Sequence, residues 1–247
     1  MVYFLLPAFN EEKAISVQLN AIGRVAASGK FSYCVYVVDD GSKDKTKEVV
    51  RELSGEMPVV LLEHEKNKGV GEAFRTGFSK LLKAMKDDDI VVTMDADNTQ
   101  DLASVRLMVK RIEEGYEVAI GSIYAPGGMM VGVSLLRKIL SWGCNWIYQI
   151  CFPISGIKEY TGFYRAHSAY ALKTAYAKFG AHLIESNGFG AMAEMLIKLR
   201  SIPLLMTEVP MIIRYDFKEG ASKIKILPTI GEHINIIRKN LFIKGTY

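Results

Sequence analysis

Two carboxylates, Asp95 and Asp97, end an apolar run near the middle of the chain. The run 90–95 has the composition of a buried strand, and side chains two residues apart share one face of a strand. Hard divalent cations prefer carboxylate oxygens, and Mg²⁺ commonly joins protein carboxylates to substrate phosphates. Ligands of open α/β sheets bind just beyond the carboxyl ends of the strands. The pair therefore indicates a site for a metal ion and a diphosphate, and the alternative is an ordinary Asp- and Asn-rich surface turn.

Polar residues also follow two earlier apolar runs, residues 2–6 and 33–38. The first run leads to Asn10, which we expect to cap a helix that extends to about residue 28. The second leads to Asp39 and Asp40. These acids could simply cap the next helix, and taken alone this structural interpretation is preferred. Acids at such positions also accept hydrogen bonds from nucleosides in other nucleotide-binding sheets.

A glycine-rich stretch, residues 67–71, resembles a phosphate-binding loop. It lacks the third glycine of a dinucleotide fingerprint and the Gly-Lys-Ser/Thr of a P-loop, which disfavours hydride-transfer and NTPase functions. Its glycines, including Gly69, still allow the backbone to approach a ligand closely.

Basic residues near the end of the chain, Arg214, Lys218 and Lys223, accompany Ser222 on a Gly- and Ser-containing loop. The loop could be an ordinary solvated surface, or a flap that closes on phosphates.

Arg165 is not part of this loop: it is a single basic residue within an aromatic stretch. A buried charge of this kind needs an anionic partner.

Regular strand and helix alternation accounts for the first half of the chain. We expect strands at 2–6, 33–38, 59–62, 90–95 and 118–121, with helices between them. Such alternation predicts an α/β fold with a mainly parallel sheet, in which the polar strand ends gather at one edge. Helices are also expected at 168–178, 190–199 and 229–242, and an extended run at 204–215.

Residues 129–154 are strongly apolar and contain Trp142 and Trp146, with Arg137 and Lys138 near the middle. The central charges and the short length disfavour a transmembrane span. One interpretation is a pair of helices that lie in a membrane interface. A subunit interface or ordinary core is the alternative, and the segment alone does not separate the two.

Composition suits one large α/β domain of 247 residues better than two small ones. A charged fraction of 23% disfavours disorder, and the net charge of +4 suits anionic ligands or an anionic membrane but is too weak to indicate nucleic acid. The three cysteines have no metal-ligand spacing, so we expect them to be reduced. We also expect no signal peptide and no transmembrane helix.

Taken together, these segments resemble family 2 glycosyltransferases with a GT-A fold, in particular the branch of dolichol-phosphate mannose synthase and other polyprenyl-phosphate glycosyltransferases. Each motif is weak alone, but their number and order over nearly the whole chain are specific. The motifs are LPAFNEE (6–12), VVDDGSKDKT (37–46), NKGVGEAFRTGF (67–78), MDADN (94–98), EYTGFYRA (159–166), EVP (208–210) and RYDFKEGASK (214–223).

The resemblance implies a role for each matching residue, and the roles fall into four groups. The nucleotide sugar would be held by Pro7, Ala8, Glu11, Asp39, Asp40, Gly69, Asp95 and Ala96. The metal, Mg²⁺ or Mn²⁺, would be bound by Asp97, with Gln100 as a further candidate ligand. Catalysis would depend on Asp95, Asp97, Arg214 and Lys223, and the acceptor phosphate would meet Arg165, Lys218 and Ser222. Glu159 departs from the family, whose members more often carry Asp there.

The implied reaction is an inverting, metal-dependent transfer from a nucleoside-diphosphate sugar to a polyprenyl phosphate. The implied protein is one GT-A domain, peripheral on the cytoplasmic side of a membrane. It comprises a nucleotide-sugar-binding half (1–125), an apolar interfacial segment (126–158) and an acceptor-binding half with a basic flap (159–247). Three alternatives remain: another glycan or lipid acceptor, a sugar nucleotidyltransferase, and an inactive membrane-docked scaffold. The nucleotidyltransferase is disfavoured because its glycine-rich loop should lie near the N-terminus, where this chain has FNEE.

Overall fold

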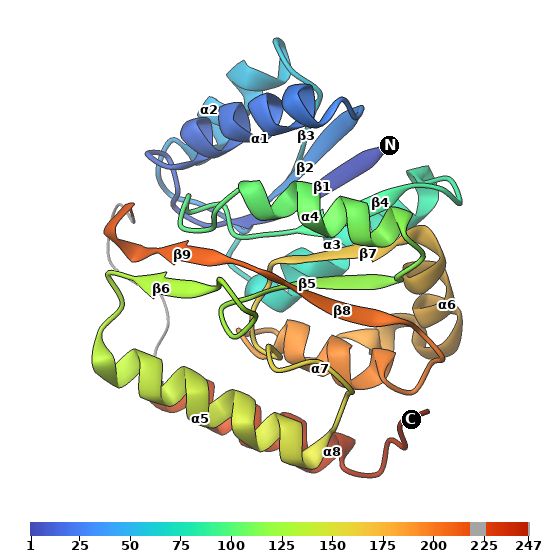
Figure 1. Ribbon diagram of the computed structural model, residues 1–247. Helices are drawn as coiled ribbons and strands as arrows, with labels where there is room; N and C mark the ends of the chain where they lie inside the picture. The colour runs from blue at the N-terminus through green and yellow to red at the C-terminus, as the bar shows by residue number, and fades with distance from the viewer. Residues whose placement is uncertain (218–225, 247) are drawn as a thin grey trace.

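A seven-stranded sheet forms the centre of the molecule, as seen in a computed structural model that describes residues 1–217 and 226–246 (Figure 1). The strand order is β3-β2-β1-β4-β7-β5-β8. Strands β1 to β4 pair in parallel, β5 pairs in parallel with β8, and β7 is antiparallel to both of its neighbours. This confirms the predicted α/β fold. The bounds are β1 Val2–Ala8, β2 Tyr33–Asp39, β3 Val59–Glu63, β4 Ile90–Thr93, β5 Val118–Ser122, β7 Arg165–Ser168 and β8 Met206–Pro210.

Helices cover both faces of the sheet, and side chains that alternate along each strand pack against them. In β1, Phe4 and Leu6 belong to the core on the α1 side, whereas Leu5 belongs to the core on the α3 side. Each fully buried Leu or Phe side chain contributes about 1.5–3 kcal/mol. One face carries α1 (Ile15–Gly29), α2 (Thr46–Ser54) and α4 (Ala103–Glu113), and the other carries α3 (Val70–Ala84), α6 (Ala169–Phe179) and α7 (Ala191–Leu199).

The loop after β1 differs from its prediction, because the first helix begins at Ile15 and Asn10 does not cap it. Asn10 has φ 54°, and its side-chain oxygen accepts the Lys43 N–H at 2.8 Å. The Asn10 N–H in turn donates to Ser42 Oγ at 2.9 Å. Asn10 therefore joins the loop after β1 to the loop after β2, and it keeps their polar residues together.

The apolar segment 129–154 forms one helix instead of the expected pair. Its first residues form β6 (Met129–Val131), which pairs in parallel with β9 (Ile212–Arg214) in a second small sheet. The helix that follows is α5 (Leu135–Cys151). The prediction of two helices was wrong because the partner strand of β6 lies about eighty residues further along the chain, beyond the reach of a local pattern.

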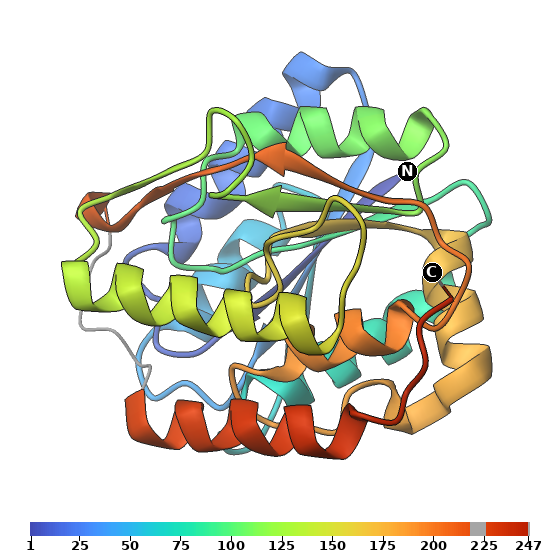
Figure 2. The same ribbon diagram turned by 60° about the horizontal axis from the view of Figure 1, so that its bottom comes forward.

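Helices α5 and α8 (Ile226–Asn240) lie alongside each other at one end of the molecule (Figure 2). The Tyr148 hydroxyl on α5 is hydrogen-bonded to His233 Nδ1 on α8 at 2.8 Å. Over residues 1–217 and 226–246, no helix has the combination of length and apolar character that a membrane span requires.

Candidate active site

The carboxyl ends of β1, β2 and β4 lie side by side and bring the first predicted site residues together. Ala8 pairs with Asp39 in the parallel register, and the Asp40 N–H donates to the Ala8 carbonyl at 2.8 Å. On the other side of β1, the Met94 N–H donates to the Leu5 carbonyl at 3.2 Å. Pro7, Ala8 and the acids after β2 and β4 thus share one edge of the sheet, as the sequence predicted.

Asp39 is completely buried at this edge. Its Oδ2 accepts the Ser42 N–H at 3.0 Å, whereas Oδ1 has no hydrogen-bond partner in the described part of the chain. A buried acceptor left unsatisfied costs about 1–3 kcal/mol, which a hydrogen bond from a ligand would recover. The arrangement leaves one carboxylate oxygen able to accept a hydrogen bond from a ligand.

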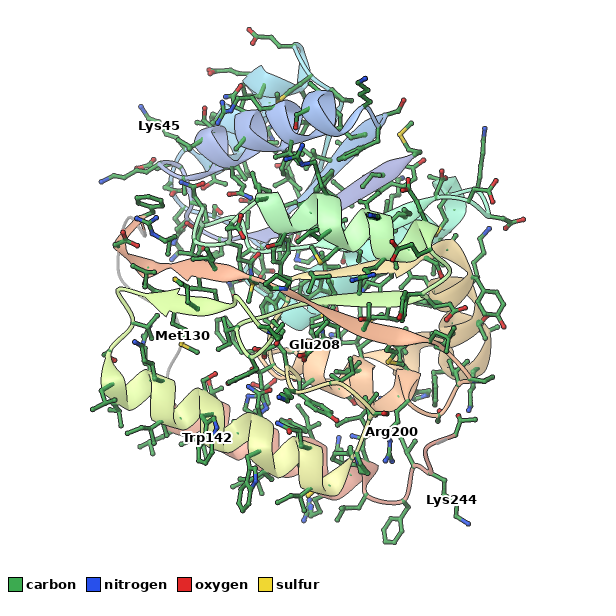
Figure 3. The ribbon with its side chains drawn as sticks, viewed as in Figure 1. Lys45, Met130, Trp142, Arg200, Glu208 and Lys244 are labelled. Atoms are coloured by element: carbon green, nitrogen blue, oxygen red, sulfur yellow. The ribbon has the colours of Figure 1, made fainter. Side chains whose placement is uncertain are left out.

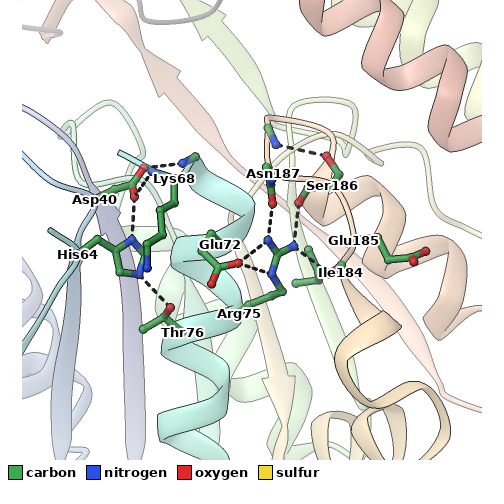
Figure 4. Close-up of polar contacts among 12 residues, drawn as sticks. Asp40, His64, Lys68, Glu72, Arg75, Thr76, Ile184, Glu185, Ser186 and Asn187 are labelled. Atoms are coloured by element: carbon green, nitrogen blue, oxygen red, sulfur yellow. Dashed lines mark hydrogen bonds and ion pairs between the residues drawn. The ribbon is translucent and has the colours of Figure 1, made fainter. Parts of the chain in front are cut away.

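Asp40 is directed differently, towards the glycine-rich loop (Figure 4). Its Oδ1 accepts the Lys68 N–H at 2.9 Å and contacts His64 Nδ1 at 2.7 Å, and its Oδ2 accepts the Gly69 N–H at 2.8 Å. His64 Nε2 contacts the Thr76 hydroxyl at 2.9 Å. Asp40 therefore holds the turn where Gly69 has φ 95°. Its direct contact with a nucleoside stays a prediction, and nothing in the residue pattern indicated the role of His64.

Asp95 lies beyond the strand, because β4 ends at Thr93 and not at residue 95. Gln100 binds it at two points: Gln100 Nε2 donates to Asp95 Oδ2 at 2.7 Å, and the Asp95 N–H donates to Gln100 Oε1 at 3.0 Å. The two acids therefore lie in a short loop, and the assumption that they share one face of a strand was wrong. The loop itself orients Asp95.

Asp97 is 9% exposed, and its Oδ1 accepts both the N–H and the hydroxyl of Thr99, at 3.2 and 2.6 Å. No cluster of three or more His, Cys, Asp or Glu side chains that could hold a metal occurs among the described residues. Mg²⁺ is commonly bound by one or two carboxylates, with waters and substrate phosphates completing its shell. The loop that carries Asp95 and Asp97, the acidic loop, therefore fits a metal that binds together with a diphosphate. Metal contact by Gln100, whose Oε1 already accepts the Asp95 N–H, stays a prediction.

Strand β9 runs beside the acidic loop, although it lies more than a hundred residues further along the chain. The Arg214 N–H donates to the Thr99 carbonyl at 2.7 Å, and the Asp101 N–H donates to the Ile212 carbonyl at 3.1 Å. The Arg214 guanidinium pairs with Asp216 at 2.7 Å, and this hydrogen bond raises the pKa of Arg214. The start of the basic segment thus lies next to the loop that carries Asp97. Lys218, Ser222 and Lys223 lie outside the described residues.

Arg165 is completely buried in β7, with its guanidinium turned towards main-chain carbonyls. Nη1 donates to the Met192 carbonyl and Nη2 to the Tyr160 carbonyl, both at 2.6 Å. Burial lowers the pKa of Arg165 to about 10, and the charge of Glu159 opposes this shift. Main-chain carbonyls thus take the place of the anionic partner that the sequence predicted, and the buried Glu159 acts on Arg165 only through its charge. Contact of Arg165 with an acceptor phosphate stays a prediction.

A connector loop, residues 184–188, lies against the glycine-rich loop and was missed by the sequence analysis. The Gly71 N–H donates to the Asn187 carbonyl at 3.0 Å, and Arg75 Nη1 donates to the Ile184 carbonyl at 3.0 Å (Figure 4). Glu194 on α7 is 1% exposed and accepts the N–H groups of residues 185 and 186, both at 2.8 Å. Glu194 on an otherwise apolar helix was the available signal, and its contacts show that it holds the connector loop.

Comparison with solved structures identifies the fold of this protein. Glucosyl-3-phosphoglycerate synthase from Mycobacterium tuberculosis, in complex with Mn²⁺, UDP and phosphoglyceric acid, superimposes with a TM-score of 0.69 at 20% identity. The alignment covers 100% of this chain and 80% of that one. The S. aureus protein TarS, residues 1–349, gives a TM-score of 0.64 at 15% identity, covering 100% of this chain and 66% of that one. At such identities the likeness shows the fold, which is the GT-A fold of glycosyltransferases.

Sequence comparison defines the family within that class. Residues 3–175 match the model of Glycosyl transferase family 2, and the chain belongs to this family. A dolichol-phosphate mannosyltransferase from Pyrococcus furiosus is 31% identical over an alignment of 248 residues. The alignment covers 99% of this chain but 64% of that protein, so the chain spans slightly less than two thirds of it. An undecaprenyl-phosphate mannosyltransferase from Micrococcus luteus is 28% identical over 210 residues, 85% of this chain and 82% of that protein. Fold and family membership thus place the chain among the glycosyltransferases, as predicted.

Proposed function

We propose that this glycosyltransferase moves a sugar from a nucleoside-diphosphate sugar to a polyprenyl phosphate, with inversion and with a divalent metal. One observation carries the proposal: the unpartnered Asp39 oxygen at the end of β2 and the Asp95–Asp97 loop after β4 lie on the two sides of β1, and β9 brings the basic segment to the same loop. The site thus combines acceptors for a nucleoside, acids for a metal and a cation for phosphates. The names of the two mannosyltransferase relatives support the acceptor class.

The nucleoside would lie across the ends of β1 and β2. Asp39 Oδ1 would accept a nucleobase N–H, because that contact satisfies its missing hydrogen bond. Pro7, Ala8 and Glu11 lie on the β1 side of the same edge. Gly69 and Ala96 would lie close to the donor, where small residues let the backbone approach the ribose and diphosphate.

The acidic loop would bind the metal and the donor. Asp97 is the proposed metal ligand and Asp95 would face the sugar nucleotide; Gln100 keeps Asp95 in place. Mg²⁺ or Mn²⁺ would supply positive charge that stabilises the departing nucleoside diphosphate. The solved GT-A neighbour with Mn²⁺ and UDP supports this choice of cofactor.

The acceptor would approach from the side of β9. Its phosphate is already anionic near neutral pH, so an oxygen of that phosphate can attack without a strong general base. The new bond joins this oxygen to the anomeric carbon while the bond to the diphosphate breaks, and its electron pair leaves with the nucleoside diphosphate. Arg214 and Lys223 would stabilise the leaving group, and Lys218, Ser222 and Arg165 are proposed to meet the acceptor phosphate.

The lipid part of the acceptor has an apolar surface available on α5. Trp142, which lies on α5 (Figure 3), and Trp146 are 62% and 55% exposed and stack with their rings 6.4 Å apart, and Lys138 is exposed on the same helix. Interfacial helices combine such aromatic and basic residues. An apolar cavity of about 400 Å³ lies between α5 and β6 and is lined by Ile123, Tyr124, Met130, Lys138, Ile139 and Trp142. We propose peripheral attachment to the cytoplasmic side of a membrane.

Release of nucleoside diphosphate from UDP-, GDP- and dTDP-sugars tests the proposal, with and without polyprenyl phosphate and Mn²⁺. We expect release with one donor, dependent on both lipid phosphate and metal, and its loss in Asp97→Ala. Full activity of Asp97→Ala would refute the metal site. Turnover with a soluble glycan acceptor, or with diacylglycerol, would assign a different acceptor, and failure to bind any nucleoside diphosphate would point to an inactive scaffold.

Sedimentation with anionic liposomes tests attachment of the protein to a membrane. We expect the wild-type protein to sediment with the liposomes, and unchanged sedimentation of the double variant Trp142→Glu, Trp146→Glu would contradict the role of α5.

A further inference from the structure

Helix α8 reaches both the connector loop and the start of α7 through the acidic side chain of Glu232. Its Oε1 accepts the Gly190 N–H at 3.1 Å and a hydrogen bond from the Ser186 hydroxyl. A Cβ added at Gly188 would collide with the Glu232 carboxylate. The two glycines therefore provide the space that this carboxylate occupies.

The remaining boundary between α8 and the connector loop is not closely packed. A cavity of about 310 Å³ lies there, lined by residues that include Glu185, Asn187, Glu232, Asn235 and Lys239. Ile236, one turn beyond Glu232, is buried and would meet a Cβ added at Gly190. Apolar contact at Ile236 thus helps to dock the helix, while Glu232 supplies the hydrogen bonds to the connector loop.

The connector loop in turn sets the position of the glycine-rich loop. A Cβ at Gly69 would collide with the Asn187 carbonyl, and one at Gly71 with the Ser186 carbonyl. Arg75 holds the connector loop at the carbonyls of residues 184 and 186, at 3.0 and 3.3 Å, and at the Asn187 side chain (Figure 4). The two loops are in direct main-chain contact, so a shift of one displaces the other.

The glycine-rich loop then continues to the sheet edge, where Asp40 accepts the N–H groups of Lys68 and Gly69. A continuous series of hydrogen bonds and short chain segments therefore joins Glu232 to Asp40. We infer that Glu232 is a positioning residue for the donor site: it fixes the connector loop, and through it the glycine-rich loop beside the diphosphate. The part of this inference that concerns the donor rests on the proposed function.

Hydrogen exchange of the ligand-free protein tests the positioning directly, because it needs no substrate. In Glu232→Ala we expect the amides of Lys68, Gly69 and Gly71 to exchange about tenfold faster, since Ser186 in the connector loop and Gly190 just after it both lose a hydrogen bond to a charged acceptor. Glu232→Gln should restore most of the protection, because its amide oxygen accepts the same two hydrogen bonds. Asn235→Ala, on the same helix and at the same cavity, is the matched control.

Kinetics of the same variants complete the test. We expect Glu232→Ala to raise KM for the sugar nucleotide about tenfold while kcat changes by less than about twofold, with rescue by Glu232→Gln. Unchanged exchange at residues 68–71 in Glu232→Ala, or an equal increase in Asn235→Ala, would overturn the inference. Faster exchange in a protein that binds no nucleoside diphosphate would support the positioning role and refute the proposed function instead.

Discussion

Gln100 closes the acidic loop on Asp95, with its amide donating to the carboxylate at 2.7 Å and accepting the Asp95 N–H at 3.0 Å. A side chain five residues further along thus fixes both the backbone and the carboxylate of Asp95. An Asp in an open loop would otherwise sample several rotamers, so this contact lowers the entropy cost of presenting the carboxylate to a ligand.

Gln100→Ala should reduce kcat/KM by about tenfold, because Asp95 loses its orienting partner. Thermal unfolding measured alongside the kinetics separates this effect from a loss of fold. Gln100→Glu, which places a second carboxylate against Asp95, should be at least as harmful. Wild-type kinetics in Gln100→Ala would show that Asp95 needs no such support.

Asp39→Asn should weaken binding of the nucleoside diphosphate by about ten- to a hundredfold, the effect of losing one hydrogen bond to a charged acceptor. The amide oxygen of Asn can still accept the Ser42 N–H, so the variant should fold. Titration calorimetry measures the dissociation constant. Asp87→Asn serves as the control, because that carboxylate is 91% exposed and pairs with Lys173. Equal affinity in wild type and Asp39→Asn would remove Asp39 from the nucleoside site.

Glu194→Ala should lower the free energy of unfolding by about 3 kcal/mol, because the buried Lys198 ammonium keeps only Glu185, at 3.4 Å, as a carboxylate partner. The charged groups of Glu194 and Lys198 are 2.7 Å apart, and their side chains are 1% and 4% exposed. Urea denaturation provides the measurement. The double variant Glu194→Leu, Lys198→Met should recover part of the loss, since no isolated charge remains; a double variant less stable than Glu194→Ala would contradict this explanation.

The stability of the protein should fall as the pH decreases below about 6.5, partly because of His167. This side chain is fully buried, neither ring nitrogen has a hydrogen-bond partner in the described chain, and burial lowers its pKa from 6.5 to about 3. Between these values the unfolded state binds the proton and the folded state does not, so each pH unit lost costs up to about 1.4 kcal/mol. Urea denaturation from pH 7 to 5 should show a smaller slope in His167→Leu than in wild type. Identical slopes would exclude His167 as a contributor.

Local sequence patterns were sufficient for the first half of the fold. The apolar runs predicted as strands at 2–6, 33–38 and 90–95 are observed as β1, β2 and β4, with ends that differ by one or two residues, and their parallel pairing places the following polar residues at one edge. Burial on both faces makes such strands continuously apolar, which is why they are visible in the sequence.

Long-range contacts were not predictable in the same way. Strand β7 is four residues long and contains Arg165 and His167, yet it lies between β4 and β5 because both offer an edge for pairing. The inward direction of Asp40 depends on main-chain N–H groups of a distant turn, and the contact of Glu232 depends on space left by Gly188. Contacts of this kind arise from packing between segments, which residue spacing within one segment does not report.

The stacked indoles on α5 have a practical consequence. The chain contains two tryptophans, and Trp142 and Trp146 are both on the exposed face of this helix. Intrinsic indole emission therefore comes from the outer surface and not from the core. A spectral blue shift on addition of lipid vesicles would report directly on this helix without any attached label. The same emission would be a poor monitor of core unfolding, for which circular dichroism is the better probe.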